Sequence, residues 1–206
     1  VLEEGDDLLY IAFSSGLSST YQNACIARDE LAEKYPDQKI LCVDSLCASL
    51  GEGLLLDLVL RKAKEGADVG ELAAYAEEIR LHVCHYFTVD DLNHLYRGGR
   101  VSKTTALFGT MLGIKPVMHV DNEGHLIPIG KVRGRRQSLD ALVTKMGTKI
   151  EGCDNPYVFV SHGDCIDDAK YVAAQVKAKY GIKTEIIGTI GPVIGSHSGP
   201  GTVALF

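Results

Sequence analysis

The sequence predicts an α/β protein with two lobes. Its first part alternates short apolar runs with segments of helical length, which is typical of a parallel sheet covered by helices. Its second part adds a hairpin signal, so that half is expected to contain antiparallel strands as well. The predicted lobes are 1–80, with a parallel sheet, and 81–206, with a mixed sheet. A cleft between two lobes is the usual place for a small-molecule site.

The first lobe is predicted from apolar runs that end in turn residues. Leu8–Phe13 and Lys39–Val43 have the length and composition of strands. Segments of helical length follow them, at 18–34, 46–64 and 69–80. The first of these helices is expected to turn three side chains inward: Ala24, Ala27 and Leu31.

The second lobe is predicted to contain a mixed sheet. Its hairpin signal is Asp121-Asn122-Glu123-Gly124, which separates two apolar runs. The expected strands are 81–89, 114–120, 126–132, 157–161, 184–189 and 203–206. The expected helices are a short one that ends at Gly98-Gly99, then 102–112, 138–150 and 166–180.

The charge of the chain argues against a nucleic-acid-binding protein. The formal net charge is -6, whereas binding by counterion release requires a strongly basic surface. Cations nevertheless gather between Arg97 and Arg136. That stretch is typical of a site for an anionic partner, and equally of a solvated surface.

The chain is predicted to be cytoplasmic. Its six cysteines show no C-x-x-C and no regular spacing, so we expect them to be reduced. No apolar run reaches the roughly 18 residues that span a bilayer, so no stable membrane insertion is expected. The chain opens at Val1 and enters a strand within a few residues, from which we expect it to begin partway through a longer gene product.

A serine-rich turn follows the first predicted strand. It reads Ser14-Ser15-Gly16-Leu17-Ser18-Ser19-Thr20 and leads into a helix. Free N–H groups and the dipole at a helix N-terminus favour an anion, so this turn predicts a carboxylate or phosphate site. The alternative is that Ser18 caps the helix and Gly16 makes the turn.

Two segments place arginines beside glycines. Arg100 lies in Tyr96–Ser102, and Arg133 lies in Lys131–Arg136. Glycine allows close approach of a partner, and the guanidinium fork suits oxyanions. Solvated loops with helix-terminus cations explain the same pattern, and both interpretations stay open.

The segment Gly195–Thr202 carries one histidine among glycines, serines and a proline. We interpret it as a rigid loop after a strand that positions His197, with an exposed loop histidine as the alternative. No metal site is predicted, because strand alternation sends His85 to the opposite face from His82 and Cys84.

Several of these motifs together are similar, in order, to the DegV family of fatty-acid-binding proteins. They cover essentially the whole chain: the SSGLSSTY turn, Val43-Asp44-Ser45, YRGGRVS, Gly113-Ile114-Lys115-Pro116, the K-x-R-G run, His162-Gly163-Asp164 and IGSHSGPGT. The resemblance implies the EDD-domain fold of that family, with a ligand tunnel between the two lobes. It also implies a non-enzymatic carrier, without cofactor, that presents a long-chain fatty acid to a separate kinase for acyl-phosphate formation in phospholipid metabolism.

The resemblance also implies roles for individual residues. Ser14 or Ser15 and His197 hold the fatty acid carboxylate, and Arg100 and Arg133 face the kinase or the transferred phosphate. The supporting loop residues are Gly16, Ser196, Ser198 and Gly199. The family's opening segment, a strand end and a Thr/Ser-rich loop, has no counterpart here.

Two other functions remain as alternatives. A Ser-His hydrolase acting on an acyl ester would use Ser14 or Ser15 as nucleophile and His197 as base, with Asp44 or Asp164 orienting it. The G-x-S-x-G motif that usually presents such a serine is absent. A phosphate-binding module would use the serine turn and the arginines, but neither common nucleotide motif is present.

Overall fold

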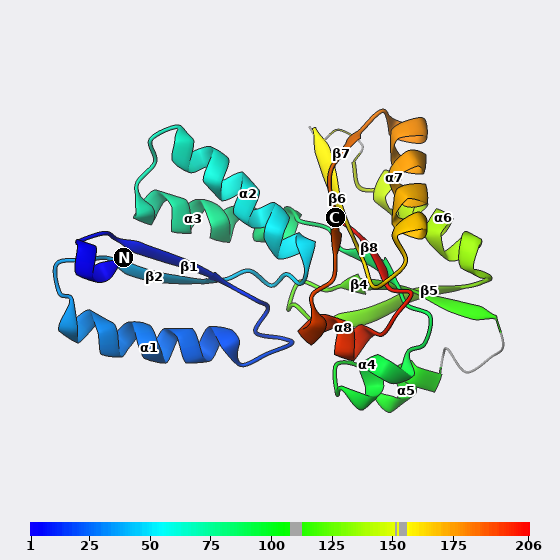
Figure 1. Cartoon of the computed structure of the whole chain (residues 1–206), viewed down its shortest axis with the longest axis horizontal. Helices are drawn as coiled ribbons and strands as arrows, with labels where there is room; N and C mark the ends of the chain where they lie inside the picture. The colour runs from blue at the N-terminus through cyan, green and yellow to red at the C-terminus, as the bar shows by residue number, and fades with distance from the viewer. Residues whose placement is uncertain (108–112, 151, 153–155) are drawn as a thin grey trace. The chain divides into compact units, whose positions relative to one another are not determined.

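The structure is a computed structural model that describes residues 1–107, 113–150, 152 and 156–206. It contains two compact units, which are drawn together in Figure 1. The first unit comprises Val1–Val83 and Asn122–His125, and the second comprises Cys84–Asp121 and Leu126–Phe206. A two-stranded parallel sheet in the first unit and a six-stranded mixed sheet in the second confirm the predicted fold class.

The first unit is a small sheet between helices. Strands β1 (Leu8–Ala12) and β2 (Ile40–Asp44) pair in parallel, with Ala12 opposite Asp44. Helix α1 (Thr20–Lys34) lies on one face of this sheet, and α2 (Leu50–Lys64) and α3 (Val69–Ile79) lie on the other (Figure 1). Short 3₁₀ turns occur at Leu2–Glu4 and Arg80–His82.

The α2–α3 face of this sheet holds the core of the first unit. Val43 of β2 packs there with Val59 of α2 and Ala76 of α3. By contrast, α1 has no buried residue, and Ala27, which was predicted to face inward, is exposed. The prediction for Ala27 was wrong because two strands lie only about 5 Å apart and cannot cover a helix about 10 Å wide.

The second unit is built on a six-stranded sheet in the order β5-β4-β3-β8-β6-β7. Neighbouring strands pair antiparallel except β6 and β7, which are parallel. The strands are β3 (Tyr86–Thr88), β4 (Ile114–Val120), β5 (Leu126–Arg133), β6 (Tyr157–His162), β7 (Lys183–Thr189) and β8 (Val203–Leu205).

In the described part of this unit, five helices accompany the sheet. They are α4 (Asn93–Arg97), α5 (Lys103–Leu107), α6 (Arg135–Gly147), α7 (Ile166–Tyr180) and α8 (Pro192–Ser198). Helices α6 and α7 bury apolar stripes against the sheet, where Leu142 and Val176 are fully buried beside Val160. The short helices α4, α5 and α8 gather elsewhere in the unit, with α4 in contact with both α5 and α8 (Figure 1).

The predicted hairpin is confirmed. Strands β4 and β5 pair antiparallel up to Val120 and Leu126, on either side of the predicted turn. The tip of this hairpin, Asn122–His125, belongs to the first unit. No helix in the described ranges is long and apolar enough to cross a membrane.

Three predicted elements differ from the structure. The strand expected at 81–89 is a 3₁₀ turn followed by β3 alone, and the helix expected at 138–150 runs three residues earlier, over Arg135–Gly147. The segment 195–202 was predicted as a loop, but its first part, up to Ser198, belongs to helix α8. This helix begins at Pro192, and proline is favoured in the first turn of a helix. The helix expected at 102–112 is described only to Leu107, and 108–112 lie outside the described residues.

Candidate functional site: a serine turn, an apolar pocket and a helix-borne histidine

The parallel pairing of β1 and β2 brings their following turns together. Asp44 ends β2 opposite Ala12 and is 8% exposed. Its carboxylate accepts the backbone N–H of Ser15, at 3.1 Å, and that of Leu46, at 3.1 Å. One buried carboxylate therefore fixes the start of both turns.

Ser14 closes the serine turn onto the hairpin tip. Its side chain is fully buried, and its hydroxyl donates to the carbonyl oxygen of Gly124 at 2.9 Å. Gly16 lies so close to the same tip that a Cβ there would stand 2.8 Å from the carbonyl oxygens of Glu123 and Gly124. This close approach requires glycine at position 16. The Ser14 hydroxyl already donates its hydrogen to Gly124.

Ser15 offers the open hydroxyl of the turn. Its side chain is half-buried and makes no hydrogen bond to any described residue. The N–H groups around it are bonded within the protein, since that of Gly16 donates to the Ser14 hydroxyl and that of Ser18 to the Ser14 carbonyl. Around Ser15 the turn therefore exposes a hydroxyl, whereas the neighbouring amides are bonded.

The capping role considered for Ser18 is present. The Ser18 hydroxyl accepts the N–H of Thr20, at 3.2 Å, where α1 begins. Ser19 is exposed and makes no capping bond with its side chain.

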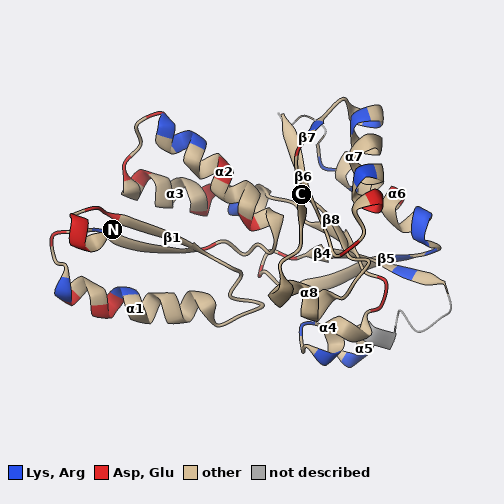
Figure 2. Cartoon of the chain, in the orientation of Figure 1, with Lys and Arg blue, Asp and Glu red and all other residues tan. Residues whose placement is uncertain are grey.

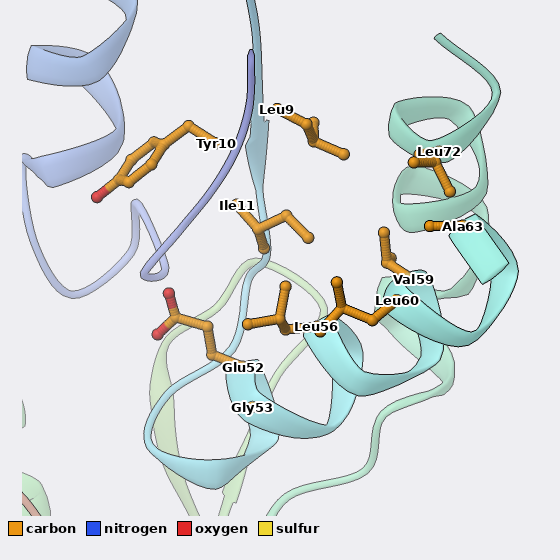
Figure 3. Close-up of a pocket in the computed structure, with 10 residues that line it drawn as sticks. All are labelled: Leu9, Tyr10, Ile11, Glu52, Gly53, Leu56, Val59, Leu60, Ala63 and Leu72. Carbon is orange, nitrogen blue, oxygen red and sulfur yellow. The ribbon is translucent and has the colours of Figure 1, made fainter. Parts of the chain in front are cut away.

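An apolar pocket of about 480 Å³ lies between β1 and the helices of the first unit (Figure 3). Leu9 and Ile11, on alternate positions of β1, form one wall. Three residues beyond Ile11 the chain reaches Ser14 and the serine turn. The full lining is Leu9, Tyr10, Ile11, Glu52, Gly53, Leu56, Val59, Leu60, Ala63 and Leu72.

One carboxyl group, that of Glu52, stands in this apolar lining. Burial raises the pKa of Glu52 from 4.5 to about 7. The carboxyl lies on the β1 side of the pocket, away from Ala63 and Leu72 (Figure 3). Nearby, burial and then the charges of Glu52 and Asp44 raise the pKa of the Cys47 thiol to about 12.

Glu52 was missed by the sequence analysis, although a signal for it exists. Helical spacing places it on the same face of α2 as Leu56, Val59 and Ala63. A single acidic residue in an apolar helical stripe is the pattern that indicates a carboxyl facing a pocket or core.

His197 occupies the last turn of α8, packed on the end of α4. Gly98 lies directly beneath the imidazole, and a Cβ at this position would overlap Nδ1 of His197. Arg100 donates to the carbonyl oxygen of Gly98 at 2.5 Å. The structure therefore brings two predicted segments, Tyr96–Ser102 and Gly195–Thr202, together within the second unit.

The supporting residues after His197 are mostly buried. Gly199 has a φ of +78° and lies against His94, which leaves no room for a side chain. Ser198 is 5% exposed, and its hydroxyl has no hydrogen-bond partner among the residues that the structure describes. Ser196 instead is exposed and donates to the carbonyl of Val193. Leaving a hydroxyl buried and unbonded costs about 1–3 kcal/mol.

The predicted arginines differ in their surroundings. Arg133 is exposed near the end of β5, and Arg100 is half-buried beside Gly98. Figure 2 shows cations on α4, α5 and β5 of this unit. Arg135 is structural, because it pairs with Asp168 at 2.8 Å and with Asp90 at 3.5 Å.

His162 has a structural role. It is 6% exposed, and its Nδ1 accepts the N–H of Cys165 just before α7 begins. Asp164 does not cap this helix, since its φ of +55° places it in the preceding turn. The prediction that His197 shares a carboxylate with Ser14 or Ser15 stays a prediction, because the serines belong to the first unit and His197 to the second.

One group of possible metal ligands occurs in the described part of the chain. Asp121, Glu123 and His125, in the β4–β5 hairpin, place ligand atoms within 4.8 Å of one another. Glu123 and His125 are exposed, and nothing else at the hairpin points to an ion. We assign no metal site to it.

Comparison with known proteins identifies a family. A family model described as "Uncharacterised protein, DegV family" matches residues 1–206. A DegV domain-containing protein of Clostridium perfringens is 44% identical over 205 residues, which cover 100% of this chain and 70% of that protein.

Solved structures share the fold. A Thermotoga maritima protein, whose structure is described as revealing a fatty acid binding function, is 29% identical with a TM-score of 0.82. The match covers 98% of this chain and 69% of that one. The fatty acid kinase B3 protein of Streptococcus pneumoniae, solved with linoleic acid, has a TM-score of 0.87 at 18% identity, covering 97% of this chain and 70% of that one. At that identity the likeness shows the fold alone.

The packing of Gly98 predicts the effect of a single methyl group. Gly98→Ala places a Cβ on the imidazole of His197, so the ring must move. We expect a changed NMR resonance of His197 Cε1–H and a loss of stability of about 1–3 kcal/mol. Gly191→Ala is the control, since a Cβ there meets nothing within 4 Å. An unchanged His197 resonance in Gly98→Ala contradicts the packing.

Glu52 predicts a pH-dependent difference in stability. Its folded pKa of about 7 exceeds its ordinary 4.5, so its contribution to stability is present below pH 4.5 and is lost as the pH rises through about 7. Glu52→Gln is expected to raise the free energy of unfolding relative to wild type above about pH 7, on the order of 1 kcal/mol after allowance for partial exposure. Urea unfolding across this pH range measures it, with Glu78→Gln on exposed α3 surface as the control. If Glu52→Gln and wild type differed in free energy of unfolding by the same amount at low and at high pH, the raised pKa of Glu52 would be refuted.

Proposed function

Because the chain belongs to the DegV family, we propose that it binds one long-chain fatty acid by its carboxylate. The observation that carries this proposal is the apolar pocket of the first unit, whose β1 wall leads directly to the serine turn. A fatty acid needs these two features, an apolar cavity for the chain and a hydroxyl for the head. The fatty-acid-binding Thermotoga maritima protein supports the assignment.

The alkyl chain supplies the affinity. Each buried methylene contributes about 0.8 kcal/mol, so a chain in a pocket lined by leucines, valine and isoleucine is bound mainly by transfer from water. The pocket volume of about 480 Å³ is in the range of small-molecule sites. Binding of this kind requires no metal and no cofactor.

The carboxylate is fixed by few polar groups. Ser15 donates its open hydroxyl, and His197 donates from its ring, supported by the buried hydroxyl of Ser198. Ser14, the other predicted carboxylate holder, would have to give up its bond to the Gly124 carbonyl to act in the same way. We therefore assign the carboxylate to Ser15 and His197, with Ser14 holding the turn.

We further propose that the chain presents the fatty acid to a separate kinase in the cytoplasm. That kinase transfers the terminal phosphoryl group of ATP to the carboxylate oxygen and releases ADP, giving an acyl phosphate for phospholipid synthesis. Arg133, exposed near the end of β5, and Arg100, beside the His197 segment, meet the kinase or the phosphate. The chain itself is a carrier and catalyses no step.

A hydrolase is not favoured. The Ser14 hydroxyl is fully buried and donates to a carbonyl, so it lacks the base that would activate it. The Asp44 carboxylate contacts the turn, but it accepts two backbone N–H groups rather than a proton from a serine hydroxyl.

The carrier function predicts the effects of two substitutions in the residues that are proposed to bind the lipid carboxylate. Ser15→Ala removes one charge-assisted hydrogen bond, and His197→Gln replaces the rigid imidazole donor by a flexible amide, so each is expected to weaken binding of a long-chain fatty acid by roughly tenfold or more. Equilibrium dialysis with labelled palmitate measures the affinity. Ser19→Ala, at the exposed neighbouring position, is the control and is expected to bind like wild type. Undiminished binding in both head-group variants would remove these residues from the site.

Presentation to a kinase predicts a separation of binding from turnover. Arg133→Ala is expected to lower the rate of acyl-phosphate formation by about tenfold while palmitate affinity stays unchanged, because Arg133 is exposed on β5 and lies outside the proposed lipid contacts. The assay combines the loaded carrier with a fatty acid kinase and ATP, and traps acyl phosphate with hydroxylamine. Lys145→Ala, another exposed cation of this unit, is the control. Equal rates for the two variants would place the kinase elsewhere.

A further inference from the structure

The pocket of the first unit combines an apolar wall with one carboxyl group. Leucine, isoleucine, valine and alanine side chains from β1, α2 and α3 make up most of the lining. Glu52 is its single carboxyl, and neither lysine nor arginine is part of it. An ionised carboxylate in this position therefore has no cation in the lining to offset its charge.

We propose that Glu52 makes this pocket a pH-responsive site for the alkyl chain of the bound lipid, which is held while the carboxyl is protonated and loosened when the carboxyl ionises. The inference rests on the proposed function, because it assigns a means of regulation to the same lipid site.

The physical reason is desolvation. Glu52 keeps part of its hydration in the open pocket, and an alkyl chain packed beside it removes that water. Loss of water disfavours the charged form, so the pKa of Glu52 is higher with lipid bound than without it. Since the pKa in the free protein is already about 7, the change falls in the physiological range.

The sign of the pH effect follows from this difference. A site whose proton is held more tightly in the bound state binds its ligand best when it is protonated. Affinity is therefore constant below about pH 7 and decreases as the pH rises past the pKa of free Glu52. Each unit by which the lipid raises that pKa lowers the affinity by up to about tenfold.

Other ionisable groups near Glu52 do not produce the same effect. Tyr10 is part of the lining, but its phenol points to the other side of β1 (Figure 3), and α3 contributes only Leu72. The Cys47 thiol, before α2, has a pKa of about 12 and stays neutral. The charges of Asp44 and Arg80 act on Cys47 from the strand end and the 3₁₀ turn, and neither lines the pocket.

A lipid with a fixed head-group charge separates Glu52 from the titration of the ligand. Labelled hexadecyl sulfonate is dialysed against the whole 206-residue chain between about pH 6 and pH 9. Wild type is expected to lose roughly tenfold in affinity across this range, whereas Glu52→Gln is expected to stay flat. Glu78→Gln, which removes an exposed carboxyl of α3, is expected to follow wild type.

His197 is the second group whose titration needs to be separated. His197→Gln is expected to bind more weakly at every pH but to keep the wild-type slope, because Glu52 is intact. A slope that persists in Glu52→Gln, or disappears in His197→Gln, assigns the pH effect to the head group and overturns the inference.

Failure of this inference differs from failure of the proposed function. Binding by wild type with no pH dependence overturns the role of Glu52 and leaves the carrier intact, whereas no binding at any pH overturns both. If Glu52→Gln does not fold, infrared spectroscopy of wild type tests the same inference through the carbonyl band of a protonated carboxyl. The band is expected to grow in wild type at about pH 8 when hexadecyl sulfonate is added, and its absence would count against the proposal.

Discussion

The first unit depends on one carboxylate at the shared end of its two parallel strands. Parallel pairing sets Asp44 beside Ala12, so the turn after β1 and the turn after β2 begin next to each other. Asp44 then accepts one backbone N–H from each turn, and such bonds to a charged group contribute about 1.5–3 kcal/mol apiece. The first turn carries Ser15, and the second leads into α2, which carries Glu52. The position of the hydroxyl offered to a ligand head and the position of the pocket wall are thus set by the same side chain.

The second unit positions its histidine by packing rather than by hydrogen bonds. Helix α8 packs closely on α4 at two glycines. Gly98 contacts the His197 ring and Gly199 contacts His94, and neither contact leaves room for a Cβ. Backbone approaches of this kind are stiff, because a close-packed interior leaves a neighbour no free volume into which it can move. In the described part of the unit, the buried hydroxyl of Ser198, the residue after His197, has no hydrogen-bond partner. A rigid frame of this kind fixes the orientation of the His197 ring, which is the preorganisation that binding of an oxyanion requires.

The sequence predicts features that depend on local chemistry and misses those that depend on distant contacts. The fold class, the hairpin and the pairing of β1 with a serine turn follow from periodicity and turn residues. Helix α8 was predicted as a loop because glycines and serines outweighed the signal of Pro192 at its first turn. The role of Ser14 rests on Gly124, which is 110 residues away in sequence, and no local pattern reveals it. Glu52 differs, because the sequence does show an acidic residue in an apolar helical stripe. Only the position of β1 in the structure shows that this stripe lines a pocket.

The size of the Glu52 effect limits what it can do for a carrier. An alkyl chain of about sixteen carbons gains on the order of 10 kcal/mol on leaving water, whereas a tenfold change in affinity corresponds to about 1.4 kcal/mol. Ionisation of Glu52 therefore adjusts the affinity without emptying the pocket. Under the proposed function, a carrier with this balance would stay loaded over the pH range in which it works, and its lipid would leave when the partner changes the head group. On that proposal, the carboxyl in the pocket and the arginines of the second unit would act on separate steps, the carboxyl on how tightly the alkyl chain is held and the arginines on transfer of the lipid to the kinase.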